Sequence, residues 1–275
     1  MKSSLPTSKS QRGALEIVTS ALKQTGDVLL ERLSGEKLVE RKPGRANIVT
    51  NIDRLAEKKI VDILHAEYPE FGIVTEESEG FTSNSPYVWI IDPIDGTNNY
   101  TFGIPLFCTT VALAKGDVIL LGVTYDPVRD ELFYAEQGRG TFLNGKKVVV
   151  SQRPRLNDCL IGYDLGYRAE VGNAMFGITK SLWPGIHGFR IMGSAALGLA
   201  YVACGRFDLY FHAWLYPWDL AAGSLMVAEA GGLVTDWFCN PVSLDTQRII
   251  ASNRITHTEF VTLAEEYLSR CEGLE

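Results

Sequence analysis

Apolar residues recur every three or four positions in several segments of the chain, which is the spacing of an amphipathic helix. The clearest pattern runs through Leu15, Val18, Leu22, Leu29 and Leu33. It predicts a helix over residues 10–34, closed by Gly35. Similar spacing or a helix-start signal predicts five more helices, which begin after Thr50, cover 172–182, 195–204 and 217–230, and begin after Thr256. In the last of these, Phe260, Leu263 and Ala264 should point inward.

Short runs of β-branched and aromatic residues predict strands between these helices. They cover residues 71–75, 89–92, 107–114, 118–125, 131–135, 160–163, 207–211 and 249–251. Asn144-Gly145 is typical of a two-residue hairpin turn. The segment 107–150 is therefore expected to be all-β, whereas helices and strands alternate elsewhere.

A polar stretch near residues 151–157 divides the chain into two expected units. Residues 1–150 would form an N-terminal α+β part, and residues 151–275 a C-terminal α/β part. The chain has 275 residues, of which 46% are hydrophobic and 21% charged. These values are ordinary for a globular protein with either one large domain or two closely packed ones.

Charge and composition exclude several function classes. The net charge of −7 argues against a nucleic-acid surface. No apolar run approaches the roughly 18 residues of a membrane span, and the N-terminus carries no apolar leader segment. The five cysteines are scattered without a Cys-x-x-Cys pair, so we expect reduced, mostly buried thiols. A soluble cytoplasmic protein is expected.

The segment Trp89 to Thr97 is the most unusual in the chain. Its apolar run ends in Asp92-Pro93-Ile94-Asp95-Gly96-Thr97. If the backbone turns at Pro93, Asp92 and Asp95 converge above the strand end, with Thr97 close behind. Adjacent carboxylates repel each other, so this arrangement predicts a cation between them.

Three further acids have local explanations that leave a second role open. Asp53 fits a capping box with Thr50, Glu76 follows a strand in what would otherwise be a solvated turn, and Asp219 fits a helix cap. Strand ends and helix starts often share one edge of an α/β structure, so these acids are expected to meet Asp92 and Asp95 there.

Such an all-oxygen ligand set suits Mg²⁺, or Mn²⁺ as a substitute, in two or three ions. Histidine and cysteine are not positioned with the acids, which argues against zinc. The chemistry implied is metal-assisted hydrolysis of a phosphate monoester. Two other segments bear on an anionic substrate. Gly193-Ser194 before the helix at 195–204 could offer backbone N–H groups to an anion or a sugar hydroxyl. The basic loop 41–45 is either a solvated connection or a phosphate or carboxylate contact.

Together these motifs resemble the inositol monophosphatase superfamily of Mg²⁺-dependent, lithium-sensitive phosphatases. The resemblance rests on Glu76-Glu77, on Asp92 to Thr97, and on Trp218-Asp219-Leu220-Ala221-Ala222-Gly223 running on to Glu229-Ala230-Gly231-Gly232. It covers nearly the whole chain. It implies a layered αβαβα sandwich of α/β (α+β) class, commonly a homodimer.

The resemblance also implies roles for individual residues. The metal ligands would be Glu76, Asp92, the Ile94 carbonyl, Asp95 and Asp219. Asp53, Thr97 and Glu76 would orient and deprotonate the attacking water. Glu77 and Lys42 would lie next to these residues without binding the metal themselves. The substrate contacts would be Gly193, Ser194, Ala195 and His212, together with Asp95 and Asp219.

One position departs from the animal inositol monophosphatases, which have a glutamate where this chain has His212. The metal chemistry is unaffected, but inositol specificity is not implied. The expected activity is hydrolysis of inositol 1-phosphate or a related small polyol or sugar phosphate. Fructose 1,6-bisphosphate, histidinol phosphate and 3′-phosphoadenosine 5′-phosphate are alternative substrates, and a catalytically silent phosphate-binding protein is the non-enzymatic alternative.

Overall fold

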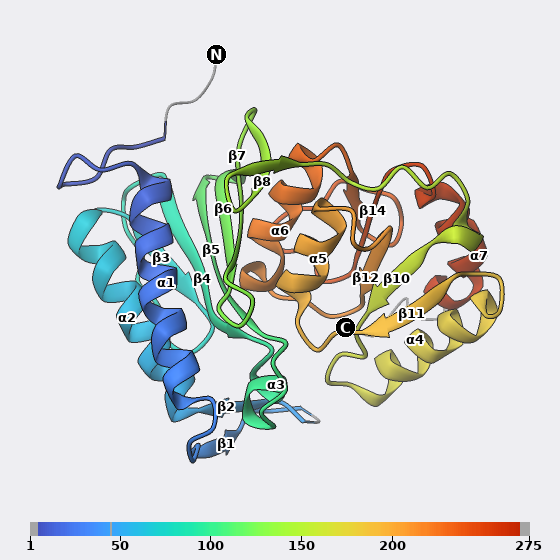
Figure 1. Cartoon of the computed structure of the whole chain (residues 1–275), viewed down its shortest axis with the longest axis horizontal. Helices are drawn as coiled ribbons and strands as arrows, with labels where there is room; N and C mark the ends of the chain where they lie inside the picture. The colour runs from blue at the N-terminus through green and yellow to red at the C-terminus, as the bar shows by residue number, and fades with distance from the viewer. Residues whose placement is uncertain (1–4, 45, 270–275) are drawn as a thin grey trace.

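The computed structural model describes residues 5–44 and 46–269, which form five stacked layers (Figure 1). The first layer holds helices α1 (Ala14–Arg32) and α2 (Asn51–Glu67). A large sheet follows, then helices α5 (Ala195–Ala203) and α6 (Pro217–Glu229), then a smaller sheet, and last helices α4 (Ala169–Leu182) and α7 (His257–Ser269). The predicted αβαβα sandwich is confirmed.

The large sheet has seven strands in the order of the chain. They are β3 (Gly72–Thr75), β4 (Tyr87–Asp95), β5 (Cys108–Lys115), β6 (Val118–Asp126), β7 (Glu131–Glu136), β8 (Gly140–Leu143) and β9 (Lys146–Val148). Only β3 and β4 are parallel, and each later pair is antiparallel. Helix α3 (Thr97–Thr101) lies in the connection between β4 and β5, whereas the later strands are joined by short turns. At the β8–β9 hairpin both Asn144 and Gly145 have positive φ, as a two-residue turn of this kind requires.

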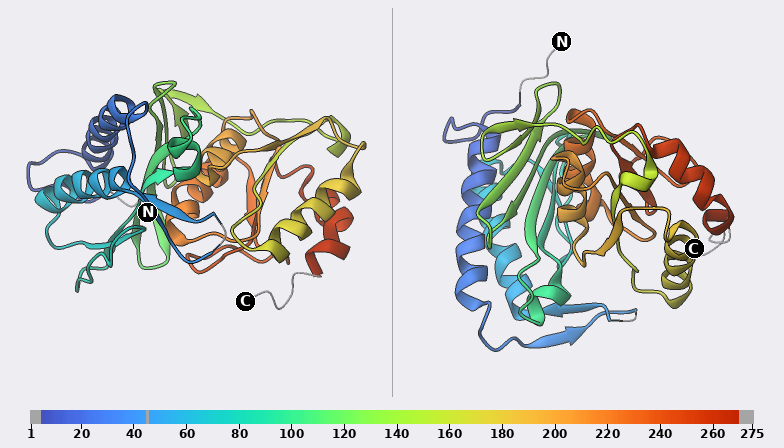
Figure 2. Two further views of the ribbon diagram at one scale, coloured as in Figure 1. Left: turned by 90° about the horizontal axis from the view of Figure 1, so that it is seen from below. Right: turned by 45° about the vertical axis from the view of Figure 1, so that its right-hand side comes forward.

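The smaller sheet has five strands with crossovers between them. Its order is β11 (Gly188–Ile191), β10 (Leu160–Tyr163), β12 (Leu209–His212), β14 (Ile249–Ser252) and β13 (Leu233–Thr235). The first three strands are parallel, whereas β14 runs antiparallel to both of its neighbours. The loops that follow β10 and β12 therefore leave the sheet at the same edge. Figure 2 shows the layers of the molecule from two further directions.

The middle helices pack closely against both sheets because small residues line their contacts. A Cβ added to Gly122 of β6 would lie 2.7 Å from the backbone oxygen of Ala222 in α6. A Cβ added to Gly223 of α6 would lie 2.5 Å from Cβ of Leu199 in α5. One apolar cluster runs from Ile90 of the large sheet through these helices to Ala251 of the small one.

Smaller elements complete the chain. A two-stranded ribbon of β1 (Val39–Arg41) and β2 (Ile48–Thr50) precedes α2, and the short helix α3 (Thr97–Thr101) follows β4. A single 3₁₀ turn, η1 (Leu156–Asp158), precedes β10. The sequence pattern predicted none of β1, β2, β11, β13 and α3. The division into two units near residue 150 stays a prediction.

Three expectations need correction or qualification. The chain does not turn at Pro93, because β4 continues to Asp95. In α7, Phe260 and Ala264 are buried as predicted, but Leu263 is exposed. Cys108, Cys159, Cys204 and Cys239 are free thiols; the first two are buried and Cys239 is exposed. Cys271 lies outside the described residues, as does Arg45 of the basic loop.

Candidate metal centre

A bulge at the end of β4 brings Asp92 and Asp95 to the same side of the strand. Asp92 pairs with Thr110 of β5 and Asp95 with Cys108, so three steps along β4 match two steps along β5. In a regular strand, residues three apart point to opposite faces. The extra residue cancels that alternation, and it falls where Pro93 has no N–H to give to the ladder.

Asp92, Asp95 and Asp219 form a cluster of carboxylates, with one oxygen from each within 4.8 Å of the others. None of the ion pairs among the described residues involves these three aspartates. Burial raises the pKa of Asp92 well above its usual value, and the neighbouring charges of Glu76, Asp95 and Asp219 raise it further. The pKa of Asp219 rises for the same reasons.

Asp219 reaches the cluster from the start of α6. Tyr216 occupies the cap position, and Asp219, three residues later, accepts a hydrogen bond from the Tyr216 backbone N–H at 2.7 Å. Asp219 is therefore the acid of a capping box rather than the cap residue itself. This bond uses one carboxylate oxygen, and the other is left for the cluster.

Asp95 is held by the N-terminus of α5. The backbone N–H groups of Ala195 and Ala196 donate to its two oxygens at 3.1 and 2.9 Å, and the Ser194 hydroxyl also donates to it. These bonds oppose the rise in pKa that burial causes at Asp95. The helix N-terminus thus binds an anion, which was one of the two ligands that the sequence suggested, and this anion is a carboxylate of the protein.

Glu76 lies beside the cluster and is paired with a lysine. The Lys42 ammonium lies 2.9 Å from Glu76 and 2.8 Å from Glu77. Burial raises the pKa of Glu77 to about 7, with a further rise from the charge of Glu76. The basic loop therefore makes a carboxylate contact, which was one of its two predicted roles.

Asp53 and Thr97 form a second group next to the cluster. Asp53 makes the predicted capping box with Thr50, and its other oxygen accepts from the Thr97 hydroxyl at 2.9 Å. The same hydroxyl lies 3.0 Å from the Ile94 carbonyl oxygen. Burial raises the pKa of Asp53, although the hydrogen bonds from Thr50 oppose this. Both predicted roles of Asp53 are therefore compatible.

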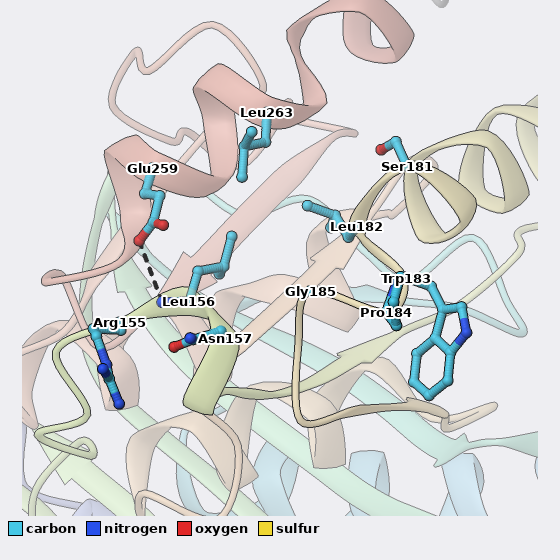
Figure 3. A pocket seen from close by; sticks show the side chains of 10 residues that line it. All are labelled: Arg155, Leu156, Asn157, Ser181, Leu182, Trp183, Pro184, Gly185, Glu259 and Leu263. Carbon is cyan, nitrogen blue, oxygen red and sulfur yellow. Dashed lines mark hydrogen bonds between the residues drawn. The ribbon is translucent and has the colours of Figure 1, made fainter.

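A cavity of about 260 Å³ opens above the cluster. Of the predicted site residues it is lined by Glu76, Asp92, Ile94, Asp95, Thr97, Gly193, Ser194, Ala195, His212 and Asp219. A larger cavity, of about 400 Å³, lies far from these acids between η1, the end of α4 and α7 (Figure 3). The one acid of this larger cavity, Glu259, accepts a hydrogen bond from the Leu156 N–H. The clustered acids line the smaller cavity, which is therefore the candidate reaction site.

Comparison with known proteins agrees with this geometry. The model of the inositol monophosphatase family matches residues 10–269, which is nearly the whole chain. The protein belongs to this family.

Named relatives within the family differ in what they are called. A Thermotoga maritima fructose-1,6-bisphosphatase/inositol-1-monophosphatase is 36% identical, with 94% of this chain and 98% of that protein aligned. A Nus factor SuhB from Xylella fastidiosa is 40% identical over 82% of this chain and 83% of its own length. The crystal structure of the suhB protein from Bartonella henselae superposes with a TM-score of 0.88 at 36% identity, covering 92% and 98% of the two chains.

The residues present fit the metal dependence of this phosphatase family. The donors that converge are carboxylates, and their mutual repulsion has no cationic partner at the cluster among the described side chains. Hard oxygen donors of this kind hold Mg²⁺ or Mn²⁺. Glu76 lines the same cavity, but its carboxylate is turned to Lys42.

Two residues that hold the Met192–Gly193 turn beside the cavity belong to no sequence motif. Asp164, after β10, accepts hydrogen bonds from the backbone N–H groups of Met192 and Gly193 at 2.9 and 2.5 Å, and from the Tyr210 hydroxyl. Asn99 of α3 donates to the carbonyl oxygens of Met192 and Leu106. A lone acid or amide carries no signal in the sequence, because its partners lie about 30 and 90 residues away.

Proposed function

We propose that this protein is a Mg²⁺-dependent phosphomonoesterase that hydrolyses inositol 1-phosphate or a related small polyol or sugar phosphate. The observation that carries the proposal is the convergence of Asp92, Asp95 and Asp219 in one cavity, beside the Asp53–Thr97 pair. Membership of the inositol monophosphatase family and the names of the relatives support it.

In this proposal Asp92, Asp95 and Asp219, with Glu76 and the Ile94 carbonyl, hold two or three Mg²⁺ ions, which Mn²⁺ can replace. When bound, the ions neutralise the carboxylates, let an anionic phosphate approach, and make water more acidic. For Glu76 to serve as a ligand, its carboxylate must share its charge between the metal and Lys42. Glu77, on the far side of Lys42, keeps the lysine in place.

Thr97 and Asp53 would remove the proton from the attacking water. The Thr97 hydroxyl has one proton, which it donates to Asp53 or to the Ile94 carbonyl, and its lone pairs remain free to accept from water. As the water oxygen attacks phosphorus, its proton passes to Thr97 and the Thr97 proton passes to Asp53. The raised pKa of Asp53 favours this transfer. The P–O ester bond breaks, and the leaving oxygen takes a proton from a solvent water to depart as the alcohol.

Gly193, Ser194, Ala195 and His212 would contact the alcohol part of the substrate, where Asp95 and Asp219 also face the cavity. Because the Gly193 N–H donates to Asp164 and the Ser194 hydroxyl gives its proton to Asp95, the lone pairs of the Ser194 oxygen remain to accept a hydrogen bond from a substrate hydroxyl. The alternatives are fructose 1,6-bisphosphate, histidinol phosphate and 3′-phosphoadenosine 5′-phosphate.

The test is phosphate release from a panel of about a dozen monoesters with Mg²⁺, with and without lithium. Release that needs Mg²⁺ and falls with lithium supports the proposal. Release from no ester would refute it and would favour the silent phosphate-binding protein. Asp92→Asn is expected to abolish turnover.

For partners, we propose a small phosphorylated substrate, a homodimer and a cytoplasmic location, without nucleic acid. The net charge of −7 supports the last point, although several relatives carry the name Nus factor SuhB. Within residues 5–44 and 46–269, no helix is long and apolar enough to cross a membrane.

A further inference from the structure

Aromatic side chains form one wall of the cavity above the carboxylates. They come from the same sheet edge: Tyr167 from the loop after β10, Trp214 and Tyr216 from the loop after β12, and Trp218 from the first turn of α6. Tyr216 and Trp218 stack on each other, with ring centres 5.1 Å apart. We call these four residues the aromatic wall. The opposite side of the cavity is polar, so a ligand there meets two different surfaces.

The aromatic wall is fixed by contacts behind it. The Arg168 guanidinium lies over the Trp214 ring, 5.2 Å from its centre. Gly166 has a positive φ, and this turn places Tyr167 and Arg168 across from Trp214. On the other side, Gly44 of the β1–β2 turn lies against Tyr167, where an added Cβ would be 3.5 Å from Cβ of Tyr167. The rings are therefore preorganised.

His212 adds a hydrogen-bond donor at the inner end of this wall. Its side chain is only 7% exposed, and Nδ1 accepts the Trp214 backbone N–H at 3.0 Å. An imidazole that accepts at Nδ1 carries its proton on Nε2. Nε2 has no hydrogen-bond partner among the described residues, and His212 lines the cavity. Burial lowers the pKa of His212 to about 3, so the ring is neutral.

The cavity above the carboxylates is smaller than a typical ligand site. Its volume of about 260 Å³ is below the roughly 300–1,000 Å³ of typical ligand sites. This volume suits a phosphate group and one ring, and a whole nucleotide would project from it. Flat aromatic rings gain free energy of binding from offset stacking on aromatic side chains, beyond the apolar area that they bury.

We propose that the preferred substrate is a phosphate monoester whose alcohol carries a single aromatic or heteroaromatic ring, stacked on Trp214 and Tyr167, with a ring acceptor atom bound by Nε2–H of His212. This inference rests on the proposed phosphatase function, but it places the preferred substrate outside the polyol and sugar phosphates proposed above. The reaction is the same hydrolysis, in which water gives its oxygen to phosphorus and the alcohol leaves.

Binding is measured first, by calorimetry on the Mg²⁺-loaded protein. The ligands are 3-phenylpropylphosphonate, its cyclohexyl analogue and its pyridyl analogue, in which a CH₂ group replaces the ester oxygen and prevents hydrolysis. The phenyl compound should bind about two- to tenfold more tightly than the cyclohexyl compound, the range that aromatic pairing contributes. Equal binding of the two would overturn the stacking claim.

Variants then assign the effect to residues. Trp214→Leu should abolish the phenyl-over-cyclohexyl preference, whereas Trp183→Leu, which changes an exposed tryptophan at the other cavity, should keep it. His212→Asn keeps an acceptor near Nδ1 and loses the donor, whereas His212→Gln keeps a donor near Nε2. In the wild type the pyridyl compound should bind more tightly than the phenyl compound, because its ring nitrogen accepts from Nε2–H of His212. This preference should vanish in His212→Asn and persist in His212→Gln. Melting temperatures confirm that each variant is folded.

Turnover separates this inference from the proposed function. The matching phenyl and pyridyl ethyl phosphates should show a kcat/KM at least tenfold above that of inositol 1-phosphate, mostly through KM. If all esters are hydrolysed but inositol 1-phosphate is preferred, the phosphatase function stands and this inference fails. If none is hydrolysed but the phosphonates bind with the expected ranking, the cavity preference stands and the phosphatase function fails.

Discussion

Repulsion among the carboxylates of Asp92, Asp95 and Asp219 should destabilise the metal-free protein, so neutralising one of them should stabilise it. Each pair of carboxylates at up to 4.8 Å repels by about 3 kcal/mol at an effective dielectric constant of about 20. Asp92→Asn removes two of the three pairs in the cluster. Its backbone partner is kept, because an asparagine oxygen can still accept the Ile94 N–H at 3.0 Å. The metal-free variant should therefore be more stable than the wild type.

Protonation limits the size of this gain. Keeping one aspartate protonated at about pH 7.5 costs at most about 5 kcal/mol, since its pKa in the unfolded chain is about 3.9. A stabilisation of about 2–4 kcal/mol is therefore expected, which corresponds to roughly 5–10 °C in melting temperature for a chain of this length. Magnesium at about 100 times its Kd should add about 2.7 kcal/mol to the wild type and much less to the variant.

The assay is thermal unfolding in chelator and in Mg²⁺, with Asp126→Asn as the matched control. Asp126 is also buried, but its carboxylate lies 2.8 Å from the Arg129 guanidinium and accepts two backbone N–H groups. Neutralising it should lower the melting temperature with and without metal. If Asp92→Asn in chelator loses as much stability as Asp126→Asn, the repulsion argument is wrong.

Four further predictions follow from individual contacts. Thr97→Val should lower kcat by about 100- to 10,000-fold while Mg²⁺ still raises the melting temperature, and a lost Mg²⁺ response would contradict a role limited to proton transfer. Ser194→Ala removes a donor to Asp95 and should weaken apparent Mg²⁺ affinity by about 10- to 100-fold in a phosphate-release titration; an unchanged titration would count against it. Burial raises the pKa of Asp164 to about 7, above its unfolded value, so its stabilising effect is complete below about pH 4 and is lost as the pH rises through 7. Asp164→Asn should flatten that part of the stability profile, and a profile as steep as wild type would refute this. Gly223→Ala places a methyl group against Leu199 and should cost about 1–3 kcal/mol in urea unfolding, whereas no loss would show that α5 and α6 can move apart.

The sequence was sufficient for the elements whose pattern is local. Leu22 and Leu29 are fully buried in α1, as their spacing predicts, and the Asn144-Gly145 turn lies where expected. Features set by distant partners could not be predicted. The four-residue strand β11 ends in the exposed Ile191 and lacks a clear alternation, so only its pairing with β10 defines it. The continuation of β4 past Pro93 depends likewise on pairing with β5.

The candidate site divides in the same way. Asp92, Asp95 and Asp219 were predictable because each stands at an element end marked by proline, glycine or a cap. The aromatic wall was not, because Tyr167 and Trp214 are 47 positions apart in the sequence and meet only through the parallel pairing of β10 and β12. Their chemistry is visible only after the topology places both loops at one edge.

The turn at Met192–Gly193 links the carboxylate cluster to the side of the cavity formed by Gly193 and Ser194. Asn99, in the helix that follows the strand bearing Asp92 and Asp95, donates to the carbonyl oxygens of Met192 and Gly193 at 2.9 and 3.3 Å. Asp164, from the second sheet, accepts from the N–H groups of the same two residues. Both peptide units are thus held from opposite sides, and the next residues, Ser194 and Ala195, bind Asp95. A substitution in the Met192–Gly193 turn should therefore alter the orientation of the Asp95 carboxylate. Affinities for the proposed substrate and for Mg²⁺ should then vary together in variants of this turn.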